Sequence, residues 1–129
     1  MSLSTGGRQA ARERILEILK SAGVQTRALI TDCSLRGAHR HRVTAFFYEV
    51  RRVKGLILDH GSGMPSGVPG ELDLLLRSCT GPLTRLGPMF REAVRMSYNW
   101  SPYRFADRCR ECGAKRHHSE SHCPACGTD

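Results

Sequence analysis

Residues 39–58 read HRHRVTAFFYEVRRVKGLIL, and this stretch decides the fold class expected for the chain. Its apolar side chains return every three or four residues, the period of an amphipathic helix. The helical stripe consists of Val43, Phe46, Phe47, Val50 and Val53. The spacing predicts a helix from His39 to Lys54 with a basic outer face. Gly55 is expected to end it, and residues 56–58 (LIL) to form a short strand.

Two helices are predicted before this segment. Apolar residues at helical spacing predict the first from Gln9 to Ala22, with Gly23 as a left-handed cap. A shorter helix is expected behind Thr26, whose hydroxyl can cap the amides of its first turn. Residues 34–37 (SLRG) are expected to form a turn in which Gly37 can adopt a left-handed conformation.

The chain after the basic helix is predicted to be a loop followed by two more helices. Glycine and proline dominate residues 61–70, which excludes regular structure there. A helix begins at Glu71, is broken by residues 80–82 (TGP), and is followed by another whose inward side holds Phe90, Ala93, Val94 and Ser97. Residues 98–108 are predicted to be extended. Their aromatics seal a junction with the carboxy-terminal module or, alternatively, stack on unpaired bases: Tyr98, Trp100, Tyr103 and Phe105.

The order helix, short helix, turn, long basic helix, strand and glycine-rich loop resembles winged helix-turn-helix domains. The resemblance covers residues 8–70, and residues 50–57 (VRRVKGLI) look like a recognition helix that runs into a wing strand. In that family the third helix enters the major groove of DNA. The resemblance implies a mainly α fold with a small β part. We expect the chain to comprise a winged-helix-like domain at 8–70, a helical connecting segment at 71–106 and a separate module at 107–129.

Four cysteines in the last module have the spacing C-x2-C-x10-C-x2-C, which predicts a metal site in a chain without secretory features. Four thiolates complete a tetrahedral shell with no open position, so the expected ion is a structural Zn²⁺. The predicted ligands are Cys109, Cys112, Cys123 and Cys126. The motif resembles the two knuckles of rubredoxin-like zinc ribbons. The histidines between the knuckles are expected to be solvated or to contact a partner, with one of them as a ligand the alternative: His117, His118 and His122.

The net positive charge of the chain indicates an anionic partner. The chain carries 20 Lys plus Arg against 12 Asp plus Glu, and most of the excess lies in residues 1–60. Arginine, which forks phosphate oxygens and guanine edges, dominates the cations, although a genome rich in G and C would also favour it. We predict that the basic helix binds double-stranded DNA, with a solvated basic face as the alternative. The predicted contacts are Arg36, Arg40, His41, Arg42, Thr44, Tyr48, Arg51, Arg52 and Lys54.

Several other classes of protein are not expected. The sequence has neither a phosphate-binding glycine loop with Lys-Ser or Lys-Thr nor a His-Glu-x-x-His helix, so no enzymatic activity is predicted. Asp59 and His60 are adjacent, and neighbours on a strand point to opposite faces. Cys33 and Cys79 are predicted to be small buried apolar residues. No apolar run could span a membrane and no secretory signal is present, which predicts a cytoplasmic protein.

The sequence therefore predicts a DNA-binding transcriptional regulator with a structural zinc ribbon. Two alternatives stay open. The chain can be a zinc-stabilised subunit that binds protein within a larger nucleic-acid-processing assembly, or it can bind single-stranded nucleic acid. The ribbon can also dock a protein partner, and pairing into a homodimer would match two DNA half-sites.

Overall fold

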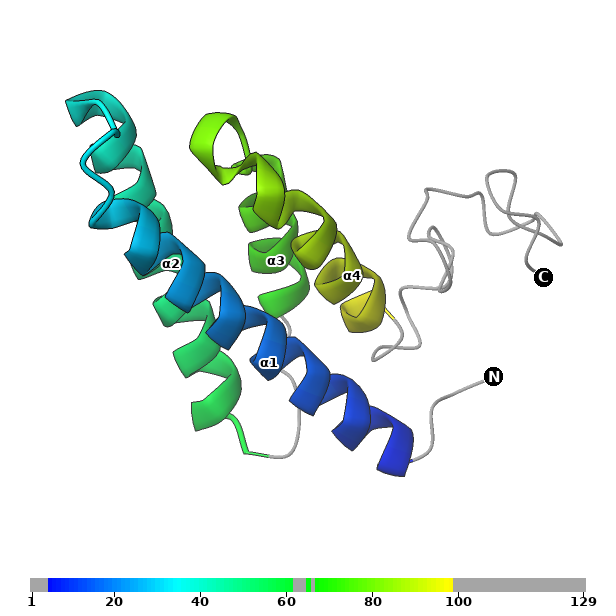
Figure 1. Ribbon diagram of the computed structural model, residues 1–129. Helices are drawn as coiled ribbons and strands as arrows, with labels where there is room; N and C mark the ends of the chain where they lie inside the picture. Colours follow the sequence, from blue (N-terminus) through cyan, green and yellow to red (C-terminus); the bar gives the residue numbers. More distant parts are fainter. Residues whose placement is uncertain (1–4, 62–64, 66, 99–129) are drawn as a thin grey trace, which may run out of the picture.

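The computed structural model describes residues 5–61, 65 and 67–98. Over these residues the elements are α1 (Thr5–Ile30), α2 (Gly37–Asp59), α3 (Val68–Arg77), the 3-10 turn η1 (Gly81–Leu86) and α4 (Gly87–Tyr98). Figure 1 shows α1 and α2 as one antiparallel hairpin and α3 and α4 as a second hairpin beside it. This part of the chain is an up-down-up-down four-helix bundle, with the α1–α2 turn and η1 at the same end.

Helix α1 continues without interruption past Gly23, so the predicted helix end there is wrong. Thr26, expected to cap a second helix, lies inside α1 and is fully buried with Ala22. Its hydroxyl donates to the carbonyl oxygen of Ala22 at 2.9 Å, which satisfies the buried group. Leu29 and Ile30 extend the same stripe against the core. Burial along this stripe outweighs the cost of about 1 kcal/mol for one glycine in a helix.

Helix α2 likewise continues past Gly55 to Asp59, so residues 56–58 are helical and the predicted strand is wrong. Ile57 is fully buried, one turn beyond Val53 on the same face. Burying an isoleucine side chain contributes about 1.5–3 kcal/mol, more than the helix loses at Gly55. The guanidinium of Arg12 also donates to the carbonyl oxygen of Ile57 at 3.1 Å and joins this last part of α2 to α1.

These two continuous helices overturn the winged-helix prediction. The described residues contain no strand, so they hold no hairpin wing, and α1 and α2 replace the expected three-helix arrangement. The mainly α part of the predicted fold class is confirmed. The predicted zinc ribbon at 107–129 lies outside the residues that the structure describes, as does the aromatic segment after Tyr98.

One buried cluster runs through all four helices. Phe46 of α2 meets Phe90 of α4 edge to face at its centre, with ring centroids 5.6 Å apart. The inward side predicted for α4 is confirmed, because its four predicted residues are buried, as are Leu72 and Leu75 of α3. Helix α3 begins at Val68 and not at Glu71, so the prediction that residues 61–70 exclude regular structure is wrong for residues 68–70. The core therefore ties the α1–α2 hairpin to the α3–α4 hairpin.

The turns that close the bundle use few special conformations. Between α1 and α2 the Asp32 carboxylate accepts the backbone N–H of Ser34 at 2.9 Å. Gly37, expected in a left-handed turn, begins α2 instead. Among the described residues only Gly61, after α2, and Gly81, before η1, have a positive φ, at 79° and 55°. Those two positions are where glycine is needed.

Candidate nucleic-acid interface

The nine residues predicted to contact DNA all lie on α2 or at its N-cap, Arg36. From Arg36 to Lys54 they span about 27 Å of helix at 1.5 Å per residue. Their side chains do not form one uniform surface. They divide into a group at the start of α2, a group in its middle and a group near Lys54.

The first group lies at the start of α2 and keeps its positive charge. Arg40 donates to the backbone oxygen of Asp32 at 3.2 Å, and Arg42 donates to the hydroxyl oxygen of Thr80 at 3.3 Å. Both acceptors are uncharged, so these bonds orient the guanidinium groups without neutralising them. Arg36 and His41 are exposed beside them.

The fold brings two more arginines to this end of the molecule. Arg27 is exposed near the end of α1, and Arg85 is exposed on η1. We call the part formed by residues 24–45 and 78–88 the basic end. It carries five arginines and a single carboxylate, Asp32. Its arginines are Arg27, Arg36, Arg40, Arg42 and Arg85.

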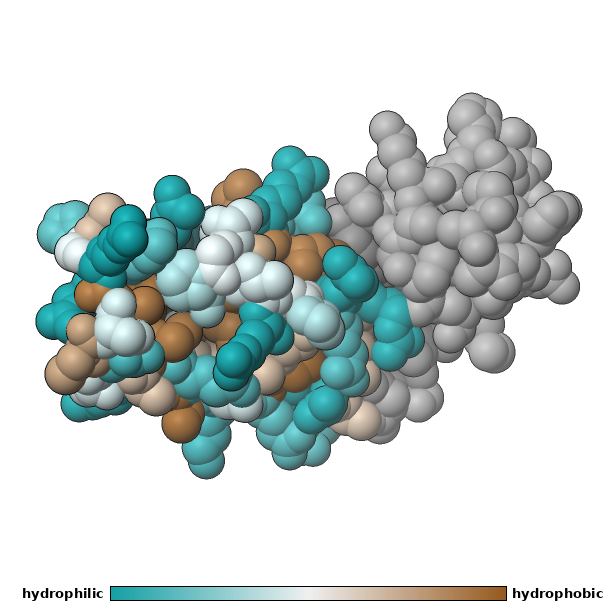
Figure 2. Space-filling model, turned by 45° about the horizontal axis from the view of Figure 1, so that its top comes forward, coloured by the Kyte–Doolittle hydropathy of each residue, from teal (hydrophilic) through white to brown (hydrophobic). Residues whose placement is uncertain are grey.

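The lone carboxylate does not cancel this charge. The N–H of Ser34 and, more weakly, the charge of Arg40 lower the pKa of Asp32, so this group stays ionised at neutral pH and offsets one of the five cations. In Figure 2 the end with the two turns is tipped forward, and hydrophilic side chains surround exposed apolar ones there. The other described residues carry ten Lys or Arg and seven Asp or Glu, so the basic end has the higher density of net positive charge.

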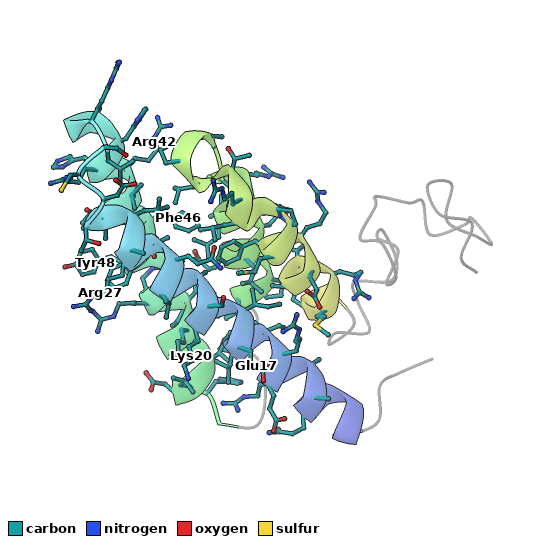
Figure 3. The ribbon with its side chains drawn as sticks, viewed as in Figure 1. Glu17, Lys20, Arg27, Arg42, Phe46 and Tyr48 are labelled. Atoms are coloured by element: carbon teal, nitrogen blue, oxygen red, sulfur yellow. The ribbon has the colours of Figure 1, made fainter. Side chains whose placement is uncertain are left out.

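The middle group combines an aromatic surface with one cation. Tyr48 is 60% exposed, and its ring meets Phe47 edge to face at 5.6 Å. The guanidinium of Arg51 lies over the Phe47 ring, 5.7 Å from its centroid, within the range of a cation–π contact. Thr44 is half-buried and its hydroxyl donates to the carbonyl oxygen of Arg40 at 2.8 Å. Figure 3 shows Tyr48 and Arg27 at the outer edge of the α1–α2 hairpin.

In the third group, Arg52 is paired with carboxylates. Arg52 bonds the carboxylate of Glu49 at 2.7 Å and that of Glu71, on α3, at 2.6 Å. The hydrogen bonds that Arg52 donates to these two carboxylates raise the pKa of Arg52, and the bonds to Glu49 lower the pKa of Glu49. Lys54 is half-buried near Glu17 of α1. Arg52 therefore joins α2 to α3 and has little charge left for a phosphate.

Sequence reasoning missed Arg27 and Arg85, which lie 58 positions apart in the chain. Each is an isolated arginine on an outer helix face, and no local motif marks either one. A continuous α1 places Arg27 in its last turn, next to the connection to the basic helix, but the expected break at Gly23 concealed this relation. Arg85 joins the basic end only because the bundle returns η1 to the α1–α2 turn.

The predicted metal ligands Cys109, Cys112, Cys123 and Cys126 lie outside the described residues. Within those residues no group of three or more His, Cys, Asp or Glu side chains could hold a metal ion. Of the two isolated cysteines, Cys33 is exposed, so the prediction that it is buried is wrong. Cys79 is half-buried, its thiol donates to the Leu75 carbonyl oxygen at 3.2 Å, and burial raises its pKa to about 11.

Comparison with known proteins adds no relative. No protein-family model, no curated protein and no solved structure matches this chain. None of the helices in the described part combines the length and the apolar character needed to cross a membrane. Function is therefore argued from the basic end itself.

Proposed function

We propose that this protein binds double-stranded DNA through the basic end of its bundle. The observation that carries the proposal is the collection of five arginines from α1, α2 and η1 around a single carboxylate. Clustered arginines concentrate positive potential, which attracts a polyanion and fits the geometry of phosphate oxygens. Tyr48, exposed on the same hairpin, adds an aromatic contact beside them.

The packing of α2 favours contacts with phosphates over contacts with bases. Both α1 and α3 flank α2, so only its outer strip is exposed and it does not project as an isolated recognition helix. Thr44, one of the nine predicted DNA contacts, already donates its hydroxyl hydrogen to the carbonyl oxygen of Arg40. Phosphate contacts position a protein on DNA and bind it in a salt-dependent way. Regulation of transcription stays a prediction that depends on this contact.

The carboxy-terminal cysteines support a second part of the proposal, a structural Zn²⁺ ion. Four thiolates suit zinc, and the two C-x2-C pairs have the spacing of zinc knuckles. The ion would supply folding free energy to its own segment rather than chemistry. Metal analysis of the purified chain is expected to give one zinc per chain, and Cys123→Ser with Cys126→Ser to remove it. A wild-type chain that purifies without zinc would contradict this part.

Fluorescence anisotropy of the full chain with a labelled 20-base-pair duplex tests the DNA contact. If five phosphates are bound, the affinity falls roughly 500-fold between 50 and 200 mM salt. Arg27→Ala with Arg85→Ala should weaken binding and reduce the salt dependence by about two counterions. Arg91→Ala with Arg95→Ala is the matched control, because it removes the same charge from α4, outside the basic end, and should leave the salt dependence unchanged.

The outcomes separate the three function classes. Salt-dependent duplex binding that is lost in the Arg27/Arg85 variant supports the proposal. Equal effects of the test and control variants would show that net charge, and not the basic end, attracts the duplex. Tighter binding to a single strand of the same length favours the single-strand alternative. No affinity for either form at 50 mM salt favours a protein-interaction subunit.

A further inference from the structure

A groove runs between α2 and α3, and it shares Arg42 with the basic end. Its volume is about 400 Å³, and its lining includes Phe46, Leu75 and Leu83, which are buried. On the α3 wall Leu74 is 57% exposed. Ala45 is exposed on the α2 wall. The exposed leucine can fill an apolar groove on another molecule, and the groove beside it can accept an apolar side chain in return.

The two ends of this groove carry opposite charge. At one end Arg42 is bonded to the uncharged Thr80 hydroxyl, so that end is positive. At the other end Glu49 and Glu71 share Arg52, which leaves one negative charge between the three groups. Arg42 and Glu49 are seven residues apart on α2, or about 10 Å along the helix. The groove is thus neutral in total on a chain of net charge +8.

The charges of this groove are complementary to those of a second copy in the antiparallel orientation. A two-fold axis across the middle of the groove sets the Arg42 end of each copy against the Glu49 end of the other. Because α3 runs opposite to α2, Leu74 lies level with Glu49, as the contacts of Arg52 with Glu71 and of Arg42 with Thr80 indicate. The same axis therefore carries each Leu74 toward the opposite groove.

We propose that a second copy of this chain occupies the α2–α3 groove and forms a two-fold symmetric dimer. Leu74 of each copy enters the groove of the other, and Arg42 of each copy pairs with the partner subunit's Glu49. The arginines of the basic end repel a second copy, whereas in this dimer Arg42 of each copy faces a carboxylate and not another arginine. In the dimer Arg42 serves the interface, and the other four arginines of the basic end stay available.

The dimer does not depend on the proposed DNA binding, and its test contains no nucleic acid. Sedimentation velocity of the full chain, with zinc present and over a range of concentrations, is expected to show a dimer. Leu74→Glu places a carboxylate in the apolar groove of the other copy, and it should weaken the dimer at least tenfold. Leu58→Glu is the control, because Leu58 is 51% exposed on α2 but does not line the groove. Circular dichroism at 222 nm checks that both variants keep their helices.

A pair of charge reversals tests the register. In Arg42→Glu alone and in Glu49→Arg alone, both symmetric pairs become repulsive, so each variant should be monomeric. Mixed in equal amounts, the two variants restore both attractive pairs and should form a one-to-one dimer. The proposal is overturned if the wild-type chain stays monomeric, if the dimer survives Leu74→Glu, or if the mixture gains no dimer.

Discussion

Replacing Gly23 or Gly55 with alanine tests the continuity of the two long helices. Both glycines lie inside helices, and a Cβ atom added at either one has no neighbouring atom within 4 Å. The substitution therefore meets no steric obstacle. Alanine in a helix interior is favoured over glycine by about 0.8–1.0 kcal/mol, so each change should stabilise the bundle by about 1 kcal/mol.

The sign of the effect distinguishes the observed fold from the arrangement expected of a winged helix. If Gly23 ended a helix in the left-handed conformation, alanine there would cost about 1–2 kcal/mol instead. Gly61 and Gly81 provide the comparison, since their φ values are 79° and 55°. Alanine at either of those positions should destabilise the chain by about 1 kcal/mol or more.

Thermal unfolding followed by circular dichroism at 222 nm measures these changes. For a domain of this size, 1 kcal/mol moves the midpoint by about 4–8 °C. Gly23→Ala and Gly55→Ala should raise the midpoint by that amount, and the double variant by about twice as much if the sites act independently. Gly81→Ala should lower it. A midpoint that falls with Gly23→Ala or Gly55→Ala would refute the continuous helices, and with them the placement of the basic end.

Three further changes test the core, a thiol and an ion pair. Phe90→Ala should lower the free energy of unfolding by about 3–5 kcal/mol, because it removes a fully buried ring and its contact with Phe46. Urea unfolding measures this loss, and a loss below about 1 kcal/mol would contradict the described core. Cys79 should react with iodoacetamide about 100-fold more slowly than an exposed thiol at pH 8, because its pKa is raised from 9.0 to about 11. Mass spectrometry of the alkylated peptides compares its rate with that of the exposed Cys33. The pKa of Glu49 is lower in the folded chain than its unfolded value of about 4.5, so ionised Glu49 stabilises the fold above that pH. This stabilisation is lost as the pH falls through the folded pKa. Between pH 5 and pH 3 the urea midpoint should therefore fall less in Glu49→Gln than in the wild-type chain.

The later helices of the bundle could be predicted from local pattern because pattern and packing agree there. The inward side of α4, with Phe90 and Ala93, follows from spacing alone, and Gly81 breaks the chain where the sequence indicates. In α1 and α2, local propensity and packing disagree. Gly23 and Gly55 indicate helix ends, yet the buried stripe continues through Thr26 in one helix and Ile57 in the other.

The candidate site was only partly accessible to sequence reasoning for a different physical reason. Arg36 and Arg40 could be identified because they lie in one basic run of the chain. Arg85 could not, because only the folded bundle brings η1 to the α1–α2 turn. The pairing of Arg52 with Glu71 is equally non-local, and it changes a predicted phosphate contact into a link between α2 and α3.

The order of helices in the bundle has a consequence for how the chain acquires its structure. Each helix packs against the one that precedes it, so the contacts that form the core close short loops, and proteins of this kind fold rapidly. Synthesis runs from the amino terminus, and residues 5–98 precede Cys109 in the chain. The bundle therefore contains none of the four cysteines of the C-x2-C pairs, and its core can form without them.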